Sequence, residues 1–136
     1  MKCFFLLAAW LLVGVSANAQ LAVTVSPVKV IGHKAVAPLA MKNDFAQKVE
    51  SARAAVFLAD ERGKVVGQAT RWVIGGSQDR PGLAAGATNV FHFVITSDKP
   101  FTTTNLTARV SFSRVVLEGG KLADIAKDVR VESASR

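Results

Sequence analysis

The chain has few of the side chains on which enzymes and metal sites depend. Its 136 residues include one cysteine, two histidines and no tyrosine. A single cysteine excludes an internal disulfide and a zinc site made of several cysteines. The sequence also lacks the metal-binding patterns H-x-E and H-E-x-x-H, an acidic calcium loop, and the G-x-S-x-G turn of many hydrolases. These absences argue against a metalloenzyme and against a serine hydrolase.

The remaining candidate residues for catalysis have ordinary structural interpretations. His33 follows Gly32 in a predicted turn, and His92 alternates with valines in a predicted strand, where we expect a half-buried side chain. Four acids lie in turn-like segments, where carboxylates commonly accept hydrogen bonds from the backbone: Asp60, Glu61, Asp79 and Asp98. We therefore predict a protein that is not an enzyme and has no catalytic residue, metal site or cofactor.

Residues 1–19 have the features of a signal peptide. A basic start, Met1-Lys2, precedes an apolar run over residues 3–15, and Ala17-Asn18-Ala19 matches the pattern of small residues that signal peptidase cleaves. We predict cleavage between Ala19 and Gln20. A retained amphiphilic anchor is the alternative, but the run is shorter than the roughly 20 residues that span a bilayer. The protein is thus predicted to be periplasmic or secreted, and to meet the membrane only during export.

The predicted mature chain is cationic and free of cysteine. The full sequence has 17 Lys and Arg against 10 Asp and Glu, and loss of Lys2 lowers its formal net charge from +7 to +6. The charge favours anionic partners such as envelope polymers. The sequence gives little support for a base-stacking platform, so we predict no specific nucleic-acid partner.

From residue 21 onward, apolar residues recur at every second position, as in β-strands. The pattern predicts an all-β, immunoglobulin-like antiparallel sandwich of two sheets over residues 20–132, followed by a flexible tail at 133–136. A closed barrel of the oligonucleotide-binding type is the alternative. The expected strands cover residues 21–30 with an interruption at Pro27, and then 35–43, 51–59, 64–74, 88–96, 106–117 and 122–131.

Several local features refine this prediction. Proline cannot donate to a ladder, so residues 21–30 are expected at a sheet edge. Residues 88–96 carry large apolar groups on both faces, which indicates a strand near the sheet centre. The apolar set changes register near Ser113, which predicts a bulge or a strand that passes out of the core, and Gly67 indicates a bulge or a crowded approach. Residues 120–128 fit either a bent strand, which we prefer, or a helical turn.

Residues 43–95 carry three local motifs of a known domain. The first is Val56-Phe57-Leu58-Ala59-Asp60 before a turn, and the second is the return strand at residues 63–67, Gly-Lys-Val-Val-Gly. The third is Pro81-Gly82 or Ala85-Gly86 before Phe91-His92-Phe93. This half of the mature chain resembles the FxLYD domain, a small sandwich module of exported bacterial proteins. The resemblance implies a sandwich fold, an exported location, and a recognition or scaffold role without an active site.

The function predicted from these features is that of a non-catalytic exported module for binding or structure. Loops of rigid sandwiches often carry function. Residues 75–87 form the longest stretch without a strand pattern, so we expect the binding surface there. The candidate binding residues in this loop and on the preceding strand are Gly75, Gly76, Gln78, Arg80 and Trp72. Two alternatives remain open. One is an inhibitor or chaperone-like partner of another exported protein, acting by loop insertion or strand addition. The other is a basic binder of anionic envelope polymers.

Overall fold

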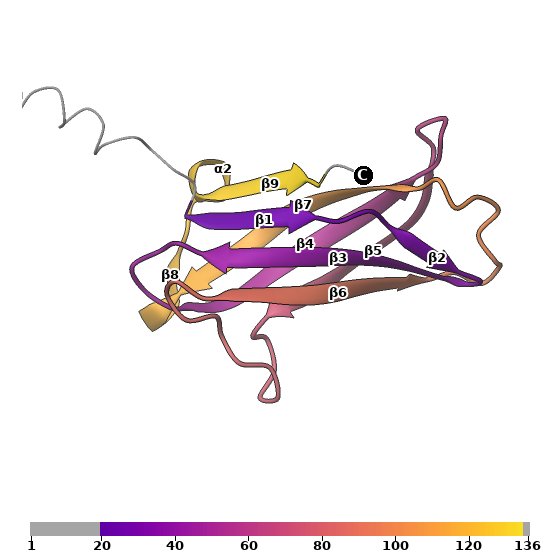
Figure 1. The fold of residues 1–136 in the computed structure, drawn as a ribbon. Helices are drawn as coiled ribbons and strands as arrows, with labels where there is room; N and C mark the ends of the chain where they lie inside the picture. Colours follow the sequence, from indigo (N-terminus) through magenta and orange to yellow (C-terminus); the bar gives the residue numbers. More distant parts are fainter. Residues whose placement is uncertain (1–19, 135–136) are drawn as a thin grey trace, which may run out of the picture.

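Two β-sheets packed face to face make up the described part of the protein (Figure 1). The structure is a computed structural model that describes residues 20–134. The predicted signal peptide and its cleavage position before Gln20 involve residues outside this range. The immunoglobulin-like all-β sandwich predicted from the sequence is confirmed. The helices within residues 20–134 are all too short to cross a membrane.

The first sheet, here called the β3 sheet, has the order β6–β3–β1–β9, with β2 beside β3. The second, the β4 sheet, has the order β5–β4–β7–β8. The strands of the β3 sheet are β1 (Leu21–Val25), β2 (Lys29–Ile31), β3 (Lys34–Asn43), β6 (Thr88–Thr96) and β9 (Val129–Ser133). Those of the β4 sheet are β4 (Val49–Ala59), β5 (Val65–Ile74), β7 (Thr107–Leu117) and β8 (Lys121–Leu122).

Alternation of side chains across each strand forms the core between the sheets. On β4, the four apolar residues at every second position of the predicted strand 51–59 are all buried: Ala52, Ala54, Val56 and Leu58. They meet side chains of the β3 sheet such as Leu39, Met41 and Phe93, which are fully buried. The two-residue period of the sequence is therefore the signature of this core.

Register shifts in the pairing of β4 with β5 and β7 change which side chains face the core. Arg53 pairs with Arg114 and Ala54 with Phe112, so Ser113 is an extra residue in β7, as predicted. A second register shift lies in β5, where Ala52 pairs with Ile74 but Arg53 pairs with Trp72. The extra residue at position 73 places Trp72 and Ile74 on opposite faces, whereas simple alternation predicts one shared face.

The positions of two strands differ from the sequence prediction. β6 pairs with β3 alone, so it lies at a sheet edge rather than near the centre. Its second apolar face is on the surface, where Val90 is 48% exposed and His92 is exposed instead of half-buried. Conversely, β1 pairs with β3 and with β9 and is not an edge strand. Pro27 lies between β1 and β2, outside either ladder.

After β8 the chain leaves the β4 sheet and joins the β3 sheet. The one-turn helix α2 (Ile125–Asp128) makes this crossing, where a bent strand was the preferred prediction. Asp124 caps the helix, since its Oδ1 accepts hydrogen bonds from the backbone N–H groups of Ala126 and Lys127. The chain then forms β9, which runs parallel to β1, so the final strand lies in the opposite sheet from β8.

Candidate functional site

The loop predicted to bind a partner, residues 75–87, is fixed to the sandwich at several points. Leu83 is buried and pairs with Val49 through two backbone hydrogen bonds of 2.8 and 2.9 Å. Gly75 has φ of +59°, and a Cβ there would lie 2.0 Å from the carbonyl oxygen of Glu50. Glycine is therefore required at position 75 by backbone conformation and by close approach, which gives it a structural role.

Arg80 also serves the loop itself. Its Nη1 donates hydrogen bonds to the carbonyl oxygens of Trp72, at 2.9 Å, and Gly75, at 3.2 Å. Its guanidinium lies 5.5 Å from the ring centroid of Phe91 on β6. Among the five candidate residues, Gln78 is exposed and Trp72 lies outside the loop on β5. The loop therefore has fewer side chains available to bind a partner than its sequence suggests.

The outer surface of the β4 sheet brings together three arginines and two aromatic residues from the neighbouring strands β5, β4 and β7. One cross-strand row contains Trp72, Arg53 and Arg114, and a second contains Gln68, Phe57 and Arg109. Small side chains separate the rows, because Ala55 pairs with Thr70 and Ser111. We call this surface the arginine face and define it by Arg53, Phe57, Trp72, Arg109 and Arg114.

Among the described residues, the arginines of this face form no ion pair with an acidic side chain. Within residues 20–134 the ion pairs join Lys42 with Asp44 and Arg130 with Glu132, both away from the face. Arg53 and Arg114 are direct cross-strand neighbours. Like charges at directly opposite positions destabilise a sheet. The pair therefore costs stability in the free protein and creates a site of concentrated positive charge.

The two aromatic residues of the arginine face have different roles. The Arg53 guanidinium lies 6.0 Å from the centroid of the Trp72 ring, within range of a cation–π contact. A Cβ at Gly76 would lie 2.4 Å from Cγ of Trp72, so the backbone of Gly76 packs on the indole. The Trp72 ring, packed on Gly76, thus contacts the Arg53 guanidinium. Phe57 is 37% exposed and leaves an apolar surface in the other row.

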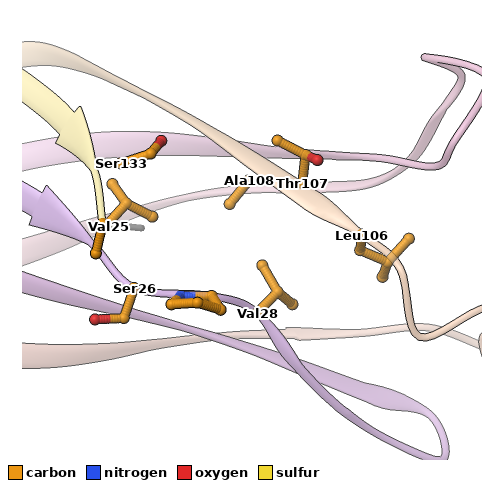
Figure 2. A pocket seen from close by; sticks show the side chains of 9 residues that line it. Val25, Ser26, Val28, Leu106, Thr107, Ala108 and Ser133 are labelled. Carbon is orange, nitrogen blue, oxygen red and sulfur yellow. The ribbon is translucent and has the colours of Figure 1, made fainter. Parts of the chain in front are cut away.

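The described residues offer little else for chemistry. Residues 20–134 contain no group of three or more His, Asp or Glu side chains that would hold a metal ion. Asp60 Oδ1 accepts hydrogen bonds from the backbone of Arg62 and Lys64, as expected for a turn carboxylate. His33 Nδ1 lies 3.2 Å from the carbonyl oxygen of Ser97. One pocket, of about 120 Å³, opens between the sheets beside the start of β7 (Figure 2).

Sequence reasoning identified Trp72 and the basic residues but did not bring them together. Arg53, Arg109 and Arg114 alternate with buried residues in the sequence, which marks them as outward-facing. Their assembly into one face depends on the pairing of β4 with β5 and β7 and on the bulge at Ser113. No family model matches the chain, and no curated protein matches it either. Membership of the FxLYD family stays a prediction.

Proposed function

We propose that this protein is an exported, non-catalytic module that binds an anionic envelope polymer on the arginine face. The observation that carries the proposal is the grouping of Arg53, Arg109 and Arg114 on one sheet surface, where none of them forms an ion pair within residues 20–134. Guanidinium groups match carboxylates and phosphates with paired hydrogen bonds. A polymer that repeats such anions would relieve the repulsion between the arginines and gain from several contacts at once.

The dimensions of the face suit an extended chain. Arg53 and Phe57 are four residues apart on one strand, which corresponds to about 13 Å at the usual rise of a β-strand. The two rows therefore present cationic groups at two levels, with Phe57 able to lie under an apolar part of the ligand. A polymer of acidic sugars has both features, since charged groups alternate with flat ring surfaces.

The test compares binding of two charge-matched variants to polygalacturonate. Arg53→Gln with Arg114→Gln removes two positive charges from the arginine face. Lys29→Gln with Lys34→Gln removes two charges from exposed positions of the β3 sheet. By titration calorimetry at low salt, we expect at least tenfold weaker binding for the arginine pair and less than threefold for the lysine pair. Binding of the unaltered protein should weaken with added salt.

Equal losses in the two variants would show that net charge alone attracts the polymer, and this would contradict the proposal. So would the absence of binding by the unaltered protein. Export is tested separately, by mass spectrometry of the protein recovered from the envelope fraction. We expect a mature chain that begins at Gln20, and a recovered chain that still begins at Met1 would contradict the predicted processing.

A further inference from the structure

Among the described strands, the β4 sheet has two edges, since β5 pairs only with β4 and since β8 covers only one end of β7. β7 pairs with β4 along its whole length. On its other side, within residues 20–134, β8 pairs only with Val116 and Leu117, and Ala123 adds one hydrogen bond to Val115. The backbone of residues 107–114 therefore has no strand partner on that side. The cause is the crossing of the chain after β8, which places β9 in the other sheet.

The β3 sheet extends past this edge. Val129 and Val131 of β9 pair with Leu21 and Val23 of β1, whose side chains are fully buried. Cross-strand partners point to the same face of a sheet, so the β9 valines also point toward the β4 sheet. They are only partly buried, as is Val110 of β7. A strip of half-covered apolar side chains thus runs alongside the unpaired edge.

A pocket continues this strip at one end. Its wall includes the apolar side chains of Val25, Val28, Leu106 and Ala108, which Figure 2 shows around the opening. Its volume of about 120 Å³ is enough for one medium-sized apolar side chain. Unpaired backbone, a half-covered apolar strip and a pocket at one end are the three features that receive an added strand.

Proteins usually protect such an edge with proline, lysine or inward-pointing charge. Residues 107–114 contain no proline and no lysine, their bulge at Ser113 lies near one end, and the inward positions hold Ala108, Val110 and Phe112. By contrast, the two edge strands on the opposite side of the sandwich are linked, because Arg71 of β5 donates a 3.0 Å hydrogen bond to the carbonyl oxygen of Val94 on β6. The β7 edge therefore differs from the β5 and β6 edges in having backbone groups that an added strand can reach.

We infer that β7 accepts an extended segment of a partner protein along residues 107–114. The segment carries apolar side chains toward β9 and the pocket and acidic side chains toward solvent. The acidic preference follows from charge complementarity, because Arg109 and Arg114 are exposed beside the positions that the outward side chains of an added strand would occupy. This docking uses the backbone of β7, which polymer binding does not need, and shares only the side chains of Arg109 and Arg114 with the arginine face.

Three peptides of ten residues test the proposal. One alternates valine with aspartate, the second alternates valine with lysine, and the third is the valine–aspartate peptide with two inner valines replaced by proline. The third keeps the charge but cannot complete a ladder. With the full chain and fluorescently labelled peptides, we expect the first to bind at least tenfold more tightly than either of the others. Equal binding of the first and third would overturn the proposal, since charge alone would then explain capture.

Amide hydrogen exchange locates the bound peptide. We expect exchange to slow within residues 107–114 when the valine–aspartate peptide binds, and to stay unchanged along β6. Protection confined to β5 or β6 would overturn the assignment. The double variant Arg109→Glu with Arg114→Glu changes two exposed side chains and should reverse the preference toward the valine–lysine peptide. Because polygalacturonate has no peptide backbone, its binding should leave exchange in β7 unchanged, which separates this proposal from the function proposed above.

Discussion

Asn43 is the one polar residue among those fully buried in the described part of the chain, and its replacement by alanine tests how the loops are held. Its Nδ2 donates hydrogen bonds to the carbonyl oxygens of Leu83, at 2.9 Å, and Gln47, at 3.0 Å. Its Oδ1 accepts one from the N–H of Phe45 at 2.8 Å. The side chain therefore joins the end of β3 to the loops on both sides, including the one predicted to bind a partner.

The expected loss of stability in Asn43→Ala depends on which hydrogen bonds the partners of Asn43 keep. Leu83 keeps the hydrogen bond from the N–H of Val49, so its carbonyl oxygen is not left alone. The groups on Gln47 and Phe45 are only part-buried and can reach water. Three hydrogen bonds at a net value of about 1 kcal/mol each, reduced by this compensation, give a loss of about 2–3 kcal/mol in the free energy of unfolding. For a domain of this size, that lowers Tm by about 8–12 °C.

The assay is calorimetric unfolding at pH 7, with Asn89→Ala on the exposed β6 strand as the matched control. The control should stay within about 0.5 kcal/mol of the unaltered protein. Asn43→Asp should be less stable than Asn43→Ala at pH 7, because its ionised carboxylate would face two carbonyl oxygens. Burial and these oxygens raise the pKa of that carboxyl, so stability should recover as the pH falls from 7 toward the ordinary aspartate pKa of about 3.9. If Asn43→Ala unfolds within 2 °C of the control, the loops are held by other contacts and the reasoning fails.

Two further predictions concern the same loop. Gly75→Ala should cost about 2 kcal/mol or more, whereas Gly86→Ala, which also has positive φ but no atom within 4 Å of its Cβ, should cost only the backbone strain of about 1 kcal/mol. Equal losses in chemical denaturation would show that the contact with Glu50 is relieved cheaply. Arg80→Ala should speed amide exchange within residues 75–83 and leave polygalacturonate affinity within twofold, because its guanidinium binds the backbone of Trp72 and Gly75. A tenfold loss of affinity would return the binding site to the loop.

The strands and the buried faces were predictable because each depends on local pattern. The alternation along residues 51–59 marks Ala52 to Leu58 as core without reference to any other strand. Ser113 was found in the same way, since the apolar positions shift by one there and the structure has the extra residue at that point. Asp60 and Gly63 likewise predict their hairpin turn from residue type alone, and Gly63 has φ of +83°.

The order of strands was not predictable, because it depends on contacts between distant segments. Two apolar faces on residues 88–96 suggested a central strand, but the same pattern occurs at an edge whose outer face is exposed apolar surface. The crossing at α2 has a sequence that fits both a bent strand and a helical turn. The capping by Asp124 decides for the turn, and the crossing made there leaves residues 107–114 paired with β4 alone among the described strands.

The role of each arginine follows from its ladder position rather than from its residue type. Arg71 pairs with Ala54 and so lies on the inner side of β5, where its guanidinium reaches the ring of Phe93 at 5.7 Å and the edge of β6. Arg53, one residue before Ala54, points outward and meets Arg114 instead of a carbonyl group. The guanidinium of Arg71 therefore has contacts within the protein, whereas that of Arg53 is available to a ligand. A count of basic residues cannot separate these cases, and for that reason the proposed binding surface emerges only when the pairing of β4 is known.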